Sequence, residues 1–172
     1  MRSNKQIRII SGEFGGRLIG TPENNGKTQP MGDRERMAIF NRLREDIEGK
    51  RILDAFAGSG ALGLEALSLG AAEVQFLERD SVAIRCIKDN LKKLDAEAEL
   101  VREAQGEYDV IFADPPYDNP QYDYCQQLFE NHLKSGGIFV LSHPAQPEPP
   151  IFAGELLSDK KYAAAHIKIY QK

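Results

Sequence analysis

The stretch RILDAFAGSGALGLEAL, residues 51–67, constrains the fold of this chain more than any other part of it. The apolar run at residues 51–54 is typical of a buried strand, residues 55–60 are mostly small, and the Ala/Leu-rich segment that follows predicts a helix. Glycines at positions 58, 60 and 63 let the backbone approach a ligand closely. Because such a loop presents N–H groups at the positive end of a helix, it predicts a site for a nucleotide-like cofactor.

Two cofactors fit this loop. The spacing of Gly58, Gly60 and Gly63 matches the dinucleotide fingerprint, and Glu78 ends a second apolar run where an acid that binds a ribose is expected. Asp54 precedes the glycines, however, and a carboxylate there would repel the pyrophosphate of NAD. S-adenosylmethionine carries a sulfonium cation and an amino group but no phosphate. The charge of Asp54 therefore favours S-adenosylmethionine, and NAD remains the alternative.

The pattern along the chain predicts an α/β domain with a mostly parallel sheet. Apolar runs alternate with helical patterns, and a C-terminal antiparallel pair is expected from residue 156 onward. Only residues 103–107 separate two of the expected strands, which is too short for a crossover helix. The expected strands after residue 67 are 73–78, 99–102, 108–113 and 137–141, and the expected helices are 33–47, 81–94 and 121–133.

The N-terminal arm, residues 1–30, is expected to form a short hairpin that contacts RNA, and residues 31–172 the main domain. The chain has a net charge of −4, but residues 1–51 carry +4 and the remaining residues −8. The basic residues that could meet phosphates in the arm are Arg2, Lys5, Arg8, Arg17 and Lys27. A solvated basic surface explains the same charges equally well.

The helix expected from Asp33 onward begins with two basic residues, Arg34 and Arg36. Basic groups at this end oppose the helix dipole. Either Asp33 and Glu35 neutralise them, or they face a bound RNA or a cofactor carboxylate.

The sequence Asp114-Pro115-Pro116-Tyr117 directly follows the strand expected at 108–113, so we expect it beside the glycine loop, where ligands bind at the carboxyl ends of strands. Two prolines stiffen the turn and remove two N–H donors, which leaves carbonyl and carboxylate acceptors. A substrate with an exocyclic –NH₂ group could donate to Asp114 and to the Pro115 carbonyl, and Tyr117 could stack on a flipped base. A rigid turn without catalytic function is the alternative interpretation.

Composition excludes several other classes. The chain has 172 residues, 41% of them hydrophobic, which suits one domain with a sizeable core. No apolar run approaches the roughly 20 residues of a membrane span, and the N-terminus does not resemble a secretory signal. Cys86 and Cys125 lie far apart without metal-ligand spacing. We therefore expect a monomeric cytoplasmic protein with no membrane segment and no metal.

The combination of these motifs resembles the RsmD family of 16S rRNA guanine-N2 methyltransferases. DAFAGSGALGLEAL and ADPPY lie behind the N-terminal SGEFGGRLIGTP and QPMGDRERMAIFNRL, and the resemblance covers nearly the whole chain. It implies a Rossmann-like class I SAM-dependent methyltransferase fold, S-adenosyl-L-methionine as cofactor and 16S rRNA, or the small-subunit ribonucleoprotein, as partner. The implied reaction is methyl transfer to the exocyclic N2 of a guanine, guanine 966 in the family.

The same resemblance assigns residues position by position. The implied catalytic residues are Asp114, Pro115, Pro116 and Tyr117. The implied cofactor-binding residues are Asp54, Ala55, Phe56, Gly58, Ser59, Gly60, Glu78, Arg79, Glu103 and Ala104. The implied RNA-binding residues are Arg8, Arg17 and Arg34.

Three other functions stay open at this point. The first is an amino-group methyltransferase on another base, such as adenine N6 in DNA or RNA, because the DPPY motif occurs there too. The second is a NAD-linked oxidoreductase, which would leave Asp114 to Tyr117 without a function. The third is a non-catalytic rRNA-binding assembly factor, which the short segment after Arg102 motivates.

Overall fold

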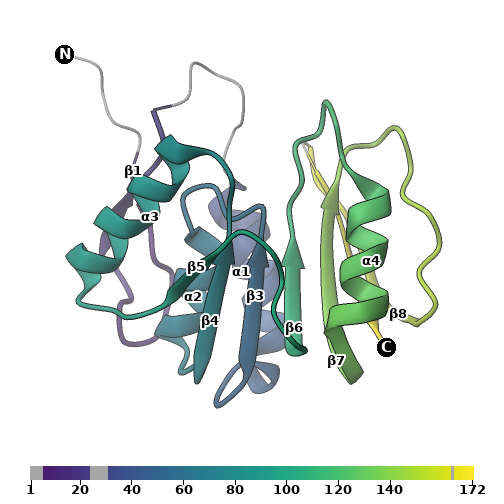
Figure 1. Ribbon diagram of the computed structural model, residues 1–172, viewed down its shortest axis with the longest axis horizontal. Helices are drawn as coiled ribbons and strands as arrows, with labels where there is room; N and C mark the ends of the chain where they lie inside the picture. Colours follow the sequence, from purple (N-terminus) through teal and green to yellow (C-terminus); the bar gives the residue numbers. More distant parts are fainter. Residues whose placement is uncertain (1–5, 24–30, 164) are drawn as a thin grey trace.

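Seven strands form one sheet in the order β5-β4-β3-β6-β7-β9-β8 in the computed structural model, which describes residues 6–23, 31–163 and 165–172 (Figure 1). The strands are β3 (Arg51–Ala55), β4 (Glu73–Leu77), β5 (Glu99–Val101), β6 (Tyr108–Ala113), β7 (Leu133–His143), β8 (Glu155–Lys161) and β9 (His166–Gln171). The five strands from β5 to β7 are parallel, and β9 runs antiparallel to both β7 and β8. The expected mostly parallel sheet with a closing antiparallel pair is confirmed.

Helices cover both faces of this sheet. They are α1 (Asp33–Leu43), α2 (Ala61–Ser68), α3 (Ser81–Leu94) and α4 (Tyr122–His132), and a short 3₁₀ turn, η1 (Arg44–Asp46), follows α1. Side chains of α1, α2 and α3 share one apolar cluster with Ile52 of β3, whereas side chains of α4 share another with Leu53. Because neighbouring strand residues point to opposite faces, the two clusters are the two layers of the core. In Figure 1, α1 and α2 lie behind the strands and α4 lies beside β7. None of the described helices is long and apolar enough to cross a bilayer.

The N-terminal hairpin consists of β1 (Gln6–Arg8) and β2 (Leu18–Gly20), paired antiparallel. Its apolar side chains are buried in the same cluster as α1, α2 and α3. These side chains are Ile7, Ile9, Phe14 and Ile19. The division expected at residue 30 therefore does not separate two hydrophobic cores: the hairpin packs as part of the helical layer.

The crossover helix that a regular α/β fold would place between β5 and β6 is absent, as the five-residue spacing predicted. Polar side chains lie on the sheet there instead. Gln75, only 2% exposed, donates to Glu99 over 2.7 Å and accepts from the Tyr108 hydroxyl over 2.5 Å. Arg51 lies over the Tyr108 ring at 4.6 Å and pairs with Glu73 at 3.0 Å. These contacts satisfy the polar groups on the part of the sheet face that a crossover helix would otherwise cover.

Gly63 in the first turn of α2 sets how closely that helix approaches β4. A Cβ on Gly63 would lie 2.3 Å from Cε1 of Phe76 and 3.0 Å from Cγ1 of Val74. We expect Gly63→Ala to lower the free energy of unfolding by about 1–3 kcal/mol, because the added methyl overpacks the helix–strand contact and outweighs the gain in helix propensity. Urea unfolding would measure this. The control is Ser81→Ala, at the exposed start of α3; Gly49→Ala is unsuitable because Gly49 has a φ of +71°. Equal urea midpoints for Gly63→Ala and Ser81→Ala would contradict the prediction.

Candidate active site

The carboxyl ends of β3 and β6 meet where the chain changes direction across the sheet. From β3 the chain continues to β4 and β5 on one side and then returns to β6 and β7 on the other. Ala55 and Ala113 are paired in register, and the N–H of Asp114 donates to the carbonyl of Ala55 over 3.5 Å. The expectation that the Asp114 loop lies beside the glycine loop is confirmed. Such a switch point is where open α/β sheets bind ligands.

The glycine loop turns tightly into α2. Gly58 and Gly60 have φ values of +56° and +77°, which favour glycine, and Gly60 is the N-cap of α2. A Cβ on Gly58 would meet only the Phe56 carbonyl, at 4.0 Å, so its surroundings are open, whereas a Cβ on Gly60 would press on Phe76 and Ile87. Gly58 therefore presents backbone outward, and Gly60, like Ser59 at 6% exposed, belongs to the packed side of the loop.

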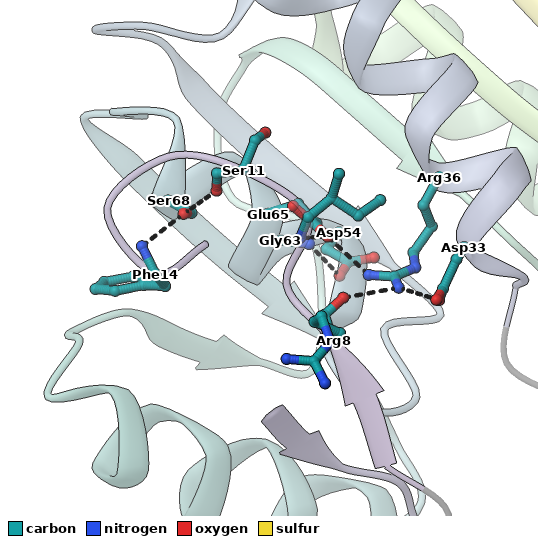
Figure 2. A network of polar contacts seen from close by, with 10 residues as sticks. Arg8, Ser11, Phe14, Asp33, Arg36, Asp54, Gly63, Glu65 and Ser68 are labelled. Carbon is teal, nitrogen blue, oxygen red and sulfur yellow. Dashed lines mark hydrogen bonds and ion pairs between the residues drawn. The ribbon is translucent and has the colours of Figure 1, made fainter. Parts of the chain in front are cut away.

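Asp54 lies beneath this loop rather than at its surface. Its side chain accepts a hydrogen bond from the N–H of Gly63 over 2.8 Å, and the residue is 1% exposed (Figure 2). Burial raises the pKa of this carboxyl well above its usual range, and the nearby Asp114 and Glu78 carboxylates add to the rise. Asp54 thus fixes the start of α2 and does not itself reach an open surface, which the sequence could not reveal.

Glu78 holds the loop from the next strand. One carboxylate oxygen accepts from the N–H of Gly58 over 2.8 Å, and the other accepts from the N–H groups of Arg79 and Asp80 over 2.7 and 2.9 Å. The side chain is half-buried. Since each carboxylate oxygen has two lone pairs and three of the four are used, one acceptor site remains for a ligand hydroxyl, on the oxygen that binds the Gly58 N–H.

An aromatic pair stands beside the loop. Phe56 adopts a φ of +61°, which is rare for a bulky residue and costs about 1–3 kcal/mol. Its ring meets that of Tyr124 edge-on at 6.0 Å, and the Arg79 guanidinium lies 5.7 Å from the Tyr124 ring centre. Ala104 packs against the same apolar cluster as Phe56 and Tyr124. Burial raises the pKa of the Tyr124 hydroxyl, and the charge of Glu103 adds to the rise. No motif in the sequence singles out Tyr124, which lies in α4, the helix after the Asp114 loop.

Asp114 and Tyr117 meet a third residue, Ser142 of β7. The Tyr117 hydroxyl lies 2.6 Å from the Ser142 hydroxyl. Burial raises the pKa of Asp114 to about 6, and a hydrogen bond from Ser142 opposes that rise. Burial also raises the pKa of Tyr117, with further contributions from Asp114 and from Glu35 of α1. Pro115 is buried and Pro116 half-buried, as expected of a stiff turn.

The hairpin arginines make contacts within the protein. Arg17 donates to the carbonyls of Lys93 and Leu94 at the end of α3, the second over 3.0 Å. Arg8 donates to the carbonyl of Gly16 over 2.6 Å. Both are exposed, as is Arg34 in the first turn of α1. Arg2, Lys5 and Lys27 lie outside the described residues.

Arg36 is fully buried and ties the hairpin to two helices. It pairs with Glu65 of α2 at 2.8 Å and with Asp33 at 2.6 Å, and it donates to the carbonyl of Arg8 over 3.0 Å (Figure 2). Of the two alternatives, neutralisation by Asp33 holds for Arg36, and Glu65 is its buried partner. Asp33 does not cap the helix, because Gly32 occupies the N-cap position.

A cavity of about 650 Å³ lies elsewhere, at the amino ends of β4 and β5, lined by Ala72, Val74, Leu91 and residues 96–99. It contains neither the glycine loop nor the Asp114 loop. Because ligands of such sheets bind at the opposite edge, we assign no chemistry to this cavity.

Comparisons with known proteins agree with the architecture. The family model described as "Conserved hypothetical protein 95" matches residues 7–171. YlbH of Bacillus subtilis is 35% identical over 183 residues, 96% of this chain and 99% of YlbH. Ribosomal RNA small subunit methyltransferase D of Haemophilus influenzae is 33% identical and covers 96% of this chain and 94% of its own length. This chain belongs to the RsmD/YlbH family.

A solved structure that is 30% identical to this chain supports the fold. The structure of yhhF from Escherichia coli superposes with a TM-score of 0.86 at 30% identity and covers 98% of both chains. The family match begins inside β1 and ends inside β9. The hairpin is therefore part of the unit that the RsmD/YlbH family shares, in keeping with its burial against α2.

Proposed function

We propose that this protein is an S-adenosylmethionine-dependent methyltransferase that modifies the exocyclic N2 amino group of a guanine in 16S rRNA, with guanine 966 as the target. The observation that carries the proposal is the adjacency of the two loops: the glycine loop after β3 and the Asp114 loop after β6 are joined by a hydrogen bond at the switch point of the sheet. The name of the Haemophilus influenzae relative, a small-subunit rRNA methyltransferase, supports the substrate.

The residues around the glycine loop suit the proposed cofactor. Gly58 offers backbone with open space around it, Glu78 offers a fixed carboxylate acceptor for a ribose hydroxyl, and Phe56 with Tyr124 offers apolar surface for a purine. S-adenosylmethionine would supply a methyl group activated by an adjacent sulfonium cation. Asp54 contributes through the position of α2, since it is buried beneath the loop and accepts from the N–H of Gly63. Ala55, Ser59, Arg79, Glu103 and Ala104 complete the proposed surroundings.

The Asp114 loop suits an amino group as the substrate. Ionised Asp114 and the carbonyl of Pro115 accept hydrogen bonds, so they can hold the two N–H donors of an –NH₂ group and direct the nitrogen lone pair away from the loop. As positive charge develops on the nitrogen, the Asp114 carboxylate stabilises it and accepts the released proton. Stacking on Tyr117 would contribute about 1–3 kcal/mol to holding the base. The rate should rise with pH through about 6, because Asp114 must be ionised.

Binding measurements separate the proposed cofactor from NAD. We expect isothermal titration to detect S-adenosylmethionine and not NAD, and we expect Glu78→Gln to weaken that binding about tenfold or more, because one ribose acceptor and one anchor of the Gly58 N–H are altered. Glu73→Gln, on the same strand at its other end, is the matched control. Binding of NAD with equal or greater affinity would contradict the proposal.

The substrate is tested on rRNA itself. Purified protein, S-adenosylmethionine with a labelled methyl group and small subunits from cells that lack the gene should yield N2-methylguanosine, which mass spectrometry identifies and maps. Deproteinised 16S rRNA tested in parallel distinguishes free RNA from the ribonucleoprotein. N6-methyladenosine would point to the adenine alternative, and binding to small subunits without methylation would point to an assembly factor.

A further inference from the structure

Ser142 lies close to the carboxyl end of β7, on the strand next to β6, and is 1% exposed. The register pairs Ala113 with Leu141, so the following residues, Asp114 and Ser142, lie side by side with their side chains on the same face of the sheet. The Ser142 hydroxyl is within 2.6 Å of the Tyr117 hydroxyl, and its donation to the neighbouring Asp114 carboxyl opposes the rise that burial causes in the pKa of that group. One buried hydroxyl thus faces the two side chains of the DPPY turn that carry polar groups.

The direction of these hydrogen bonds follows from the donors available. An ionised carboxylate can only accept, so Ser142 must give its single proton to Asp114. The Ser142 oxygen then has lone pairs left, and the Tyr117 hydroxyl donates to one of them. While Asp114 is ionised, the chain of hydrogen bonds therefore runs from Tyr117 through Ser142 to Asp114.

We propose that Ser142 is a positioning residue for the methyl transfer: its hydroxyl holds the Asp114 carboxylate and the Tyr117 ring in one fixed relative orientation, ready for the amino group and the face of the target base. This inference rests on the proposed function. The Ser142 hydroxyl occupies one Asp114 lone pair from the β7 side and leaves the others for the substrate. It also ties the Tyr117 ring to the sheet, so that the ring has no freedom to fold away from the base.

The groups that face Asp114 and Tyr117 make this bond important. Besides burial, the Asp114 carboxylate raises the pKa of Asp54 from β3, and Glu35 from α1 and Tyr122 from α4 raise the pKa of Tyr117. His143 follows on β7 but points to the opposite face, where its Nδ1 is bonded to the carbonyl of Pro144. Among the described residues that act on the Asp114 carboxyl, Ser142 is the one hydrogen-bond donor. Without it, nothing named here favours the ionised form.

The test compares Ser142→Ala with the wild type by two independent measurements. The first follows the titration of the Asp114 carboxyl carbon by NMR, for which no RNA is needed; its midpoint should move to higher pH in Ser142→Ala and stay in place in Ser142→Thr, which keeps the hydroxyl. The second is methylation of the small subunit, where kcat should fall about 10- to 100-fold with the KM for S-adenosylmethionine unchanged, and the acidic limb of the rate should move to higher pH.

Two further variants complete the design. Tyr117→Phe should leave the Asp114 titration nearly in place, because the Ser142 bond to the carboxylate remains. Ser68→Ala removes an equally buried hydroxyl that bonds to the hairpin, and it should change neither the titration nor the pH limb. An unchanged Asp114 titration in Ser142→Ala would overturn the inference. Absence of methylation by the wild type would instead overturn the proposed function, while the NMR result would still decide whether Ser142 controls Asp114.

Discussion

Replacing Asp114 by Asn should lower the rate of methyl transfer about a thousandfold, with S-adenosylmethionine still bound. The substitution keeps the shape of the side chain but turns one of its two acceptors into an –NH₂ donor that faces the –NH₂ of the substrate. It also removes the negative charge that stabilises the positive charge growing on the nitrogen. Single-turnover methylation of small subunits, with cofactor binding measured separately, gives both numbers.

The matched control for this variant is Asp118→Asn. Asp118 is an exposed carboxylate of the same loop, so its replacement changes the charge equally but touches no part of the proposed site. We expect its rate to remain within about twofold of the wild type. If Asp114→Asn methylates as fast as Asp118→Asn, Asp114 does not hold the amino group, and the Asp114 loop is a structural turn.

Replacing Arg36 by Met should lower the free energy of unfolding by about 3–5 kcal/mol, the cost of leaving the partner of a buried ion pair alone. Glu65 would keep its bond from the N–H of Ile10 but lose the cation at 2.8 Å, and the carbonyl of Arg8 would lose a donor. Figure 2 shows how these contacts join the hairpin, α1 and α2. Urea unfolding at pH 7 measures the loss.

The pH dependence gives a second signature of the same pair. Burial already raises the pKa of Glu65 above its ordinary value of 4.5, with Arg36 opposing that rise, so removal of Arg36 raises it further. The folded state then holds a proton that the unfolded state releases, and stability falls as pH rises from about 4.5 through the higher folded value. The deficit of Arg36→Met should therefore be smaller at pH 5 than at pH 8.

Two variants distinguish this explanation from a simple loss of packing. The double variant Arg36→Met with Glu65→Leu removes both charges and should recover most of the loss, since apolar pairs can replace buried ion pairs. Asp33→Ala removes only the exposed partner, whose side chain is 68% exposed, and should cost no more than about 1 kcal/mol. A double variant as unstable as Arg36→Met would show that the charge of Glu65 is not the cause.

Much of the fold could be predicted from the sequence because local pattern and global topology agree. Helix α3 spans residues 81–94 as its periodicity predicted, and β6 spans 108–113. A spacing of three places Met37 with Phe40 and Leu43 on one face of α1, yet Met37 is 46% exposed and Arg36 takes the buried position. A pattern of apolar residues cannot predict a buried arginine, because its burial depends on Glu65, which is distant in sequence.

The features of the site that depend on position along a strand could be predicted from the sequence. Those that depend on the direction of a side chain could not. The neighbouring places of the Asp114 loop and the glycine loop followed from strand order. The burial of Asp54, by contrast, follows from the N–H of Gly63 above it. Ser142 was visible as a strand-end residue, but its bond to Tyr117 depends on the register of β6 and β7, which the sequence does not specify.

The polar network around Gln75 lies near the edge of the sheet that β5 forms. Strand β5 forms one of the two edges of the sheet and has only three residues, and Glu99 at its start and Glu97 just before it place negative charge there. A short, charged border of this kind discourages another chain from adding a strand there. The β5 edge can therefore lack a covering helix and still resist backbone pairing with a second copy of the chain.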